Sequence, residues 1–403
     1  MNMRSAFALM TLCAALAPAA SAVEKASLEA LRLAREVGAT HWWRPYATTF
    51  DLGRLDETLA ALDAAAKAEK DARTLADLRF YRELLLFRAA RDDDPAGHLA
   101  AMRAVAFDKA TPPAHRFTVL LRYSQWDPEF DYWNVACGML ADDAALAADA
   151  DALSSLYSNA FESLDRKGLQ YNWSWALDPR TSNERWLEIA ERGIADAGAG
   201  RLKDLRMVNR LFELKLEALF ELERNAEAES FVAESTKEGA AFRLPALRAA
   251  GAYWRKRAER FYAAPDRADL AKAYAAYAAL NAASPKPDRE MLVEQARTAV
   301  ARGDWSAARA DFARAIAAKA VVSGGELGDV EFGAGDYEKA VSFYATDARL
   351  GVKPLKRYAQ ALSALGRHEE CLAQLEVLEK KANRHETKAV RAYIAAEKRR
   401  VGR

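Results

Sequence analysis

Hydrophobic residues along most of this chain recur at steps of three and four positions, and they rarely alternate. The stretch from Leu75 to Arg88 shows this spacing, and so does the stretch from Lys203 to Arg224. On a helix, such residues form one apolar stripe that packs against a neighbour. Ala, Leu, Arg and Glu, which are strong helix formers, dominate, and alternating β-branched runs do not occur. The pattern predicts an all-α protein.

Three segments near the C-terminus align without gaps and indicate how the helices are organised. They begin at Gly303, Gly335 and Gly366, which lie 32 and 31 residues apart. Each glycine is followed by a large residue two positions later and by a small residue five positions later. A turn glycine can adopt the left-handed backbone that ends one helix before the next begins. The small residue lets the two helices approach closely.

This pattern resembles the tetratricopeptide repeat (TPR), whose units of about 34 residues are pairs of antiparallel helices. The resemblance is clearest over residues 286–382, and weaker copies of the turn occur at 52–58 and 222–228. It implies a right-handed α-solenoid whose stacked units shield one another's apolar flanks and leave a concave face for partners. After the last unit, the stretch from His385 to Arg400 is predicted to be a basic closing helix.

The first 22 residues have the features of a signal peptide. Arg4 supplies the positive start, a short apolar stretch follows, and Ala20-Ser21-Ala22 fits a cleavage site with small residues. The mature protein is therefore expected to be periplasmic or secreted. Residues 23–200 are expected to form an N-terminal helical region with aromatic loops, and residues 201–403 a C-terminal region of TPR-like repeats. Glycines between residues 193 and 200 mark the expected joint.

The net charge and the small numbers of Cys and His limit the functions that this protein is expected to have. The 59 Lys and Arg nearly equal the 58 Asp and Glu, so the sum predicts no sustained attraction to nucleic acid or anionic lipid. No run of about eighteen apolar residues predicts a membrane span. After cleavage only Cys137 and Cys371 remain, which makes no disulfide framework. The five histidines show no metal-site spacing, and we expect neither a metal nor another cofactor.

Two aromatic-rich stretches are the most informative local feature. Residues 126–134 and 168–180 are predicted to be loops, and their candidate binding residues are Trp126, Trp133, Tyr171, Trp173 and Trp175. One interpretation is a stacking platform for a sugar ring or an anchor pocket for a partner peptide. The other is that the rings fold back and fill the solenoid's own core, where they would bury a large apolar area.

One short match suggests an enzyme. Glu162-Ser163 followed by Gly168-Leu169-Gln170 is similar to the lytic transglycosylases, in which a Glu acts as general acid on a glycan bond. The separation is shorter than that family's and its other motif residues are missing, so coincidence is the favoured explanation. We expect no enzyme. The expected function is an exported TPR-like scaffold that binds protein partners along a concave face. The alternative is binding of carbohydrate or a cell-wall polymer through the aromatic loops.

Overall fold

The computed structural model describes residues 22–38, 52–89, 94–124, 126–127, 130–170, 179–260, 265–381 and 384–400. Within these ranges every regular element is a helix and none is a strand, which confirms the all-α prediction. Except for Ala22, the predicted signal peptide lies outside the described residues. No described helix is both long enough and apolar enough to cross a membrane.

The chain divides into two compact units, Met1–Leu211 and Phe212–Arg403. The predicted joint at residue 200 lies in the connection between two helices, whereas the compact units divide inside the following helix. The first unit and this dividing helix comprise α2 (Ala22–Gly38), the 3-10 turn η1 (Leu52–Arg54), α3 (Leu55–Ala68), α4 (Ala72–Ala89), α5 (Pro95–Phe107), α6 (Pro113–Tyr123), α7 (Tyr132–Asp142), α8 (Ala144–Ala148), α9 (Ala150–Gln170), α10 (Pro179–Gly198) and α11 (Leu205–Glu221).

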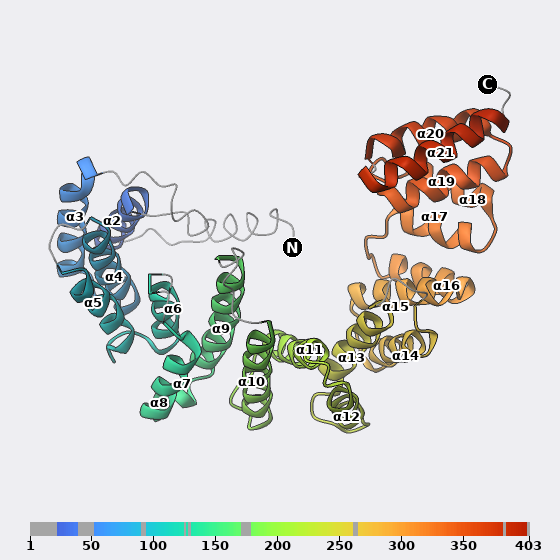
Figure 1. Cartoon of the computed structure of the whole chain (residues 1–403). Helices are drawn as coiled ribbons and strands as arrows, with labels where there is room; N and C mark the ends of the chain where they lie inside the picture. The colour runs from blue at the N-terminus through green and yellow to red at the C-terminus, as the bar shows by residue number, and fades with distance from the viewer. Residues whose placement is uncertain are drawn as a thin grey trace. The chain divides into compact units, whose positions relative to one another are not determined.

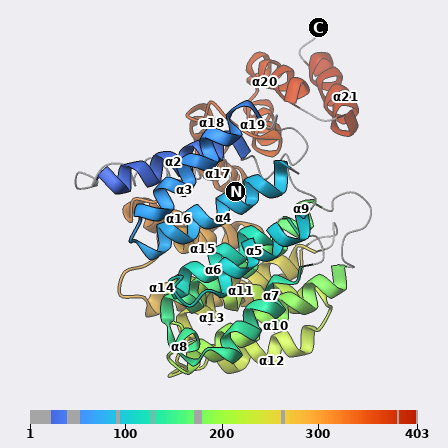
Figure 2. The same cartoon turned by 90° about the vertical axis from the view of Figure 1, so that its left-hand side faces the viewer.

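In the first unit, consecutive helices pack against each other from α2 to α6. Figure 2 shows α3, α4, α5 and α6 following one another side by side. The regular order then breaks, because α6 packs mainly against α9 and the short helices α7 and α8 lie between them in the chain. Helices α7 and α8 are therefore an insertion into the order of helix pairs.

The second unit continues the paired arrangement. Its helices are α12 (Asn225–Ser235), α13 (Arg243–Ala258), α14 (Arg267–Ala283), α15 (Arg289–Arg302), α16 (Trp305–Ala317), α17 (Gly324–Gly333), α18 (Tyr337–Ala345), α19 (Val352–Ala364), α20 (His368–Lys381) and α21 (Arg384–Arg400). The closest pairs are α13 with α14, α15 with α16, α17 with α18, and α19 with α20 (Figure 1). Helix α21 packs on α20 after the last pair, where the closing helix was expected.

The turns inside three of these pairs have the predicted backbone. Gly303, Gly335 and Gly366 have φ of 74°, 81° and 74°, in the left-handed region that glycine adopts without strain. After the first two glycines an Asp begins the next helix, and its side chain accepts a hydrogen bond from the backbone N–H three residues on. Each turn therefore ends one helix and starts its partner within two residues.

The small position five residues after each turn is fully buried. Ala308, Ala340 and Cys371 are each 0% exposed, which confirms that this position lies between two helices. The weaker upstream copies behave in the same way, because Thr58 and Ala228 are also 0% exposed. A side chain larger than these would separate the paired helices, since protein interiors are close-packed.

One predicted loop is partly helical. Residues 126–134 were expected to lie outside helices, but α7 begins at Tyr132 and therefore includes Trp133. The reason is local: the carboxylate of Asp131 accepts a hydrogen bond from the backbone N–H of Asn134 at 3.1 Å and caps the helix start. In the second predicted loop, α9 extends to Gln170 and α10 starts at Pro179.

Candidate functional site: an apolar pocket between α16, α17 and α18

The structure places only two of the five predicted binding residues. Tyr171, Trp173 and Trp175 lie outside the described residues. Trp133 is 3% exposed, and its indole N–H donates a hydrogen bond to Glu188 on α10 at 2.8 Å. A sugar or peptide could not stack on the Trp133 ring without displacing these helices. Its predicted binding role stays a prediction. Its buried surroundings are those of the alternative interpretation, in which the rings fill the protein's own core.

Trp126 lies in the turn after α6 and is partly buried. The edge of its ring meets Phe87 on α4 at a centroid distance of 6.3 Å, and the Arg88 guanidinium lies 5.5 Å from the ring centre. Both contacts attach the turn to α4. Trp126 and Trp133 thus have different surroundings, and the structure does not bring them together as one platform.

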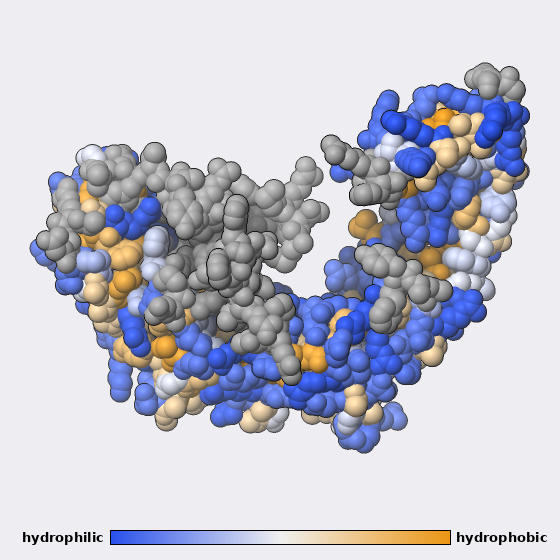
Figure 3. Space-filling model, in the orientation of Figure 1, coloured by the Kyte–Doolittle hydropathy of each residue, from blue (hydrophilic) through white to orange (hydrophobic). Residues whose placement is uncertain are grey.

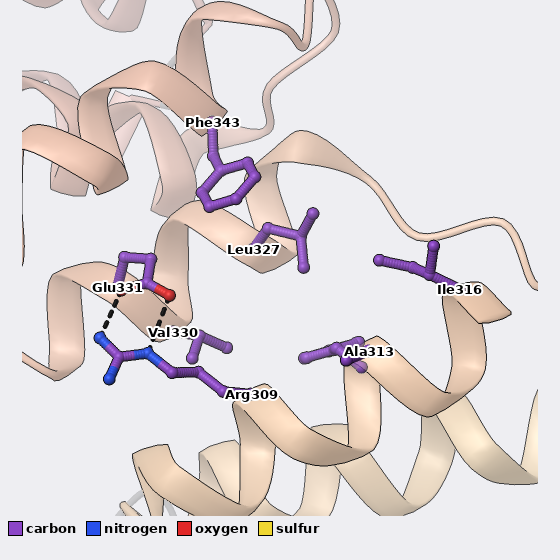
Figure 4. A pocket seen from close by; sticks show the side chains of 8 residues that line it. Arg309, Ala313, Ile316, Leu327, Val330, Glu331 and Phe343 are labelled. Carbon is purple, nitrogen blue, oxygen red and sulfur yellow. Dashed lines mark hydrogen bonds and ion pairs between the residues drawn. The ribbon is translucent and has the colours of Figure 1, made fainter.

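A pocket that the sequence analysis did not identify lies between consecutive helix pairs of the second unit. It encloses about 300 Å³ and is lined by Arg309, Phe312, Ala313 and Ile316 of α16, Leu327, Val330 and Glu331 of α17, and Phe343 of α18. Figure 4 shows Phe343, Leu327 and Ile316 around one common space. A dry apolar cavity of about 150 Å³ holds a benzene ring, so this pocket has room for a large apolar side chain.

The pocket lies at a repeat position where the following repeat has a large ring and this repeat has a leucine. Leu327 lies eight residues before the turn Gly335, and Tyr358 lies eight residues before the turn Gly366. At the next interface between pairs, Tyr358 packs against Tyr344 with ring centroids 5.4 Å apart. The corresponding contact between the earlier pairs would join Phe312 and Leu327. Leucine is shorter than tyrosine, so the space stays open.

The inner wall and the mouth of the pocket differ in exposure. Phe312 and Val330 form the inner wall and are 1% and 2% exposed. At the mouth Ile316 is 47% exposed. Figure 3 shows hydrophobic residues at the surface between α16 and α17. Large apolar side chains exposed beside an apolar pocket are typical of a binding site.

An ion pair closes one side of the pocket. Arg309 Nε donates to Glu331 Oε1 at 2.9 Å, and a second Arg309 nitrogen contacts the other carboxylate oxygen (Figure 4). This bidentate contact raises the pKa of Arg309 above its ordinary value. The Glu331 side chain is only 10% exposed, whereas that of Arg309 is 44% exposed. The pocket is therefore apolar, with one fixed cation at its rim.

The residues that could bind a metal or act in catalysis do not form a site in the described part of the chain. Among the described residues, no three His, Cys, Asp or Glu side chains converge as metal ligands would. His368 and Cys371, one turn apart on α20, do not share a site: Cys371 is fully buried, and the His368 ring contacts Glu397 at 2.7 Å. Glu162 is exposed on α9 and is not part of the pocket. The enzymatic alternative stays a hypothesis.

The arrangement defines a class of protein: a chain of paired helices with an apolar pocket between two neighbouring pairs. Comparison with known proteins finds neither a family model nor a curated relative that matches the chain. Eight residues before the turn glycine, the three repeats hold Gln295, Leu327 and Tyr358, so the alignment alone does not single out Leu327. The position becomes informative only when Tyr358 is known to contact the preceding pair.

Proposed function

We propose that this chain is a TPR-like helical scaffold that binds protein partners, and that the pocket between α16, α17 and α18 receives an aromatic side chain of the partner. The observation that carries this proposal is the apolar pocket at Leu327, in the place that Tyr358 fills at the next interface. The neighbouring interface indicates which group fits, because Tyr358 occupies the equivalent place there. A partner's ring would complete the packing that this interface lacks.

The expected energy is that of one anchor residue. A buried aromatic side chain removes roughly 150 Å² or more from water, which at about 25 cal/mol per Å² contributes about 4 kcal/mol. Interfaces usually depend on a few such residues surrounded by nearly neutral contacts. The exposed side chain of Ile316 at the mouth would add apolar contacts around the ring. The pocket would therefore determine which segment binds.

Export belongs to the same proposal. The signal-peptide features of residues 1–22 support a mature protein that begins at Val23 and acts in the periplasm or outside the cell. Helix α2 begins at Ala22, and its first buried side chain is that of Ser27. Cleavage after Ala22 would consequently remove no residue that packs in the described part of the first unit.

A displayed peptide library tests the proposal. The mature chain should select peptides that share one aromatic residue, and a selected peptide should bind in a fluorescence anisotropy titration. Leu327→Tyr should weaken that binding tenfold or more, because the new ring fills the pocket as Tyr358 fills its own interface. The matched control is Leu205→Tyr, which adds the same ring at a residue that is 67% exposed on α11.

Stability separates a blocked pocket from a damaged one. Leu327→Tyr should keep the helical circular dichroism and the melting temperature, since the ring fills empty space and its hydroxyl can reach water at this partly exposed position. Selected peptides without a common large apolar residue would contradict the proposal. So would a Leu327→Tyr variant that folds normally and binds the selected peptide as tightly as the original chain does.

A further inference from the structure

Positive charge is concentrated at the C-terminal end of this nearly neutral chain. Residues 349–400 contain 13 Lys and Arg but only 6 Asp and Glu, although the net charge of the whole protein is +1. The rest of the chain is therefore net acidic. An uneven distribution of this kind favours attraction of an anionic partner to one end of a protein.

Helix α21 carries this charge on one side. Val390, Ile394 and Glu397 face the protein and are 8%, 8% and 0% exposed. The exposed positions hold Lys388, Arg391, Lys398 and Arg399. With about 100° between successive residues, these four cations fall within an arc of about 100° on one flank of the helix, beside the buried stripe. From Lys388 to Arg399 the helix rises about 17 Å at 1.5 Å per residue, so the cations form a strip along α21.

Most of this basic strip is not neutralised. Arg391 forms an ion pair with Glu379 of α20. In the part of the chain that the structure describes, Lys388, Lys398 and Arg399 form no ion pair. This differs from α13, where Arg248, Arg255 and Lys256 each contact two or three carboxylates. The cations of α13 serve packing within the unit, whereas those of α21 are available to a ligand.

The strip is held in place by buried contacts. The Glu397 carboxylate accepts hydrogen bonds from Ser363 on α19 and is contacted by His368 on α20. Arg400 also donates to the Ser363 hydroxyl at 3.1 Å. Because Glu397 contacts residues of two other helices, α21 cannot rotate without breaking these contacts. The basic side is thus presented in a fixed orientation.

A neighbouring helix repeats one of these cations. The buried residues Tyr358 and Leu362 of α19 lie 32 residues before Val390 and Ile394 of α21, so the two helices share a register. In that register Lys356, which is exposed, corresponds to Lys388. Helices α19 and α21 are linked through Ser363 and Glu397. Lys356 therefore has the same position on α19 that Lys388 has on α21.

We propose that α21 is a docking surface for the phosphate headgroups of an anionic phospholipid bilayer. The strip is straight and carries only alanine between its cations, at positions 389, 392 and 395, so it fits contact at headgroup level without insertion. It has no aromatic ring for base stacking and no Asn or Gln for base edges, which nucleic-acid recognition uses. This surface lies apart from the pocket and does not depend on the proposed function.

Vesicle sedimentation with the full mature chain tests the proposal. The chain should bind phosphatidylcholine vesicles that contain phosphatidylglycerol and should not bind vesicles of phosphatidylcholine alone. Binding should weaken as salt is added, because the cations are exposed to solvent. Replacing Lys388, Lys398 and Arg399 together by Gln should weaken it about 100-fold, since each cation near an anionic surface contributes about fivefold.

Two controls make the result decisive. The triple variant Lys25→Gln, Lys203→Gln, Lys286→Gln removes the same charge at exposed positions elsewhere and should bind as the original chain does. Exchanging Lys388 and Lys398 for Arg should keep binding. Equal loss in both triple variants, or binding to uncharged vesicles, would overturn the proposal. Tighter binding to duplex DNA than to the anionic vesicles at the same salt would also overturn it.

Discussion

The carboxylate of Glu397 on α21 accepts a hydrogen bond from the hydroxyl of Ser363 on α19 at 2.8 Å. The ring of His368 on α20 lies 2.7 Å from the same carboxylate oxygen, and Glu397 is 0% exposed. Burial alone would raise the pKa of Glu397, but the hydrogen bonds from His368 and Ser363 and the charge of Arg400 outweigh it, so the pKa is lowered. An ionised carboxylate therefore joins the last three helices.

Replacing Glu397 by Gln should loosen α21 selectively. The amide keeps the shape but loses the charge that His368 and Arg400 stabilise, which should cost about 2 kcal/mol. Amide hydrogen exchange should then speed up about 30-fold in α21, because each 1.4 kcal/mol is a factor of ten. Exchange in α15 and α16 should not change. If the amides of α21 exchange at the same rate in the variant and in the original chain, this contact does not hold the helix.

The contribution of Glu397 should depend on pH. Its pKa in the folded protein lies below the ordinary value of 4.5, so the unfolded chain binds its proton more readily. The stabilisation is complete above that ordinary value and is lost as the pH falls through the lowered pKa. The difference in stability between the original chain and Glu397→Gln should shrink below about pH 4.5. A constant difference from neutral to acidic pH would contradict this linkage.

Two glycines on helices should respond oppositely to alanine. A Cβ at Gly328 of α17 would lie 2.5 Å from the buried ring of Tyr344, so Gly328→Ala should cost about 1–3 kcal/mol through overpacking. A Cβ at Gly138 of α7 would meet nothing within 4 Å. Gly138→Ala should therefore stabilise the protein by up to about 1 kcal/mol, the difference in helix propensity. Urea denaturation followed by circular dichroism gives both values.

Cys371 should behave as a packing residue. It takes the place of Ala308 and Ala340 in the repeats, and burial raises the pKa of its thiol to about 11. Cys371→Ala should cost less than about 1.5 kcal/mol, whereas Cys371→Leu should cost about 1–3 kcal/mol because the helices must separate. In the folded protein the thiol should react with a thiol reagent only slowly. Rapid labelling of Cys371 under native conditions would contradict this assignment.

Trp133 and Trp126 should differ in their importance for stability. Trp133 is 3% exposed and contacts Tyr157 with ring centroids 5.9 Å apart, so Trp133→Ala should cost about 3–5 kcal/mol. Trp126→Ala should cost clearly less, because that ring is only partly buried. Thermal unfolding of both variants measures the difference. Equal losses would mean that the turn after α6 contributes as much packing as α7.

Export can be checked directly. When the whole chain is produced with its first 22 residues in a bacterium, the protein recovered from the periplasm should have the mass of a chain that begins at Val23. Changing Ala20 and Ala22 to bulky residues should block this cleavage, since signal peptidase needs small side chains there. An uncut chain found only in the cytoplasm would remove the export part of the proposed function.

Local pattern alone was enough for the helical class and for the turns of the C-terminal repeats. The period of the apolar residues predicts helices, and Gly303, Gly335 and Gly366 adopt the left-handed backbone that their positions required. The burial of Ala308 and Ala340 could be predicted for the same reason. These properties depend on residues a few positions apart, so they can be recognised in the chain without knowledge of its neighbours in space.

The sites were decided by contacts between segments distant in the sequence. The pocket at Leu327 exists because of what α16 and α18 place around it, and Glu397 is ionised because α19 and α20 bring partners to it. Trp133 belongs to a helix because Asp131 caps its start, and its burial follows from packing on α10. The near-zero net charge likewise conceals the basic strip of α21. The net charge does not say where the charged residues lie, whereas folding determines which of them share a surface.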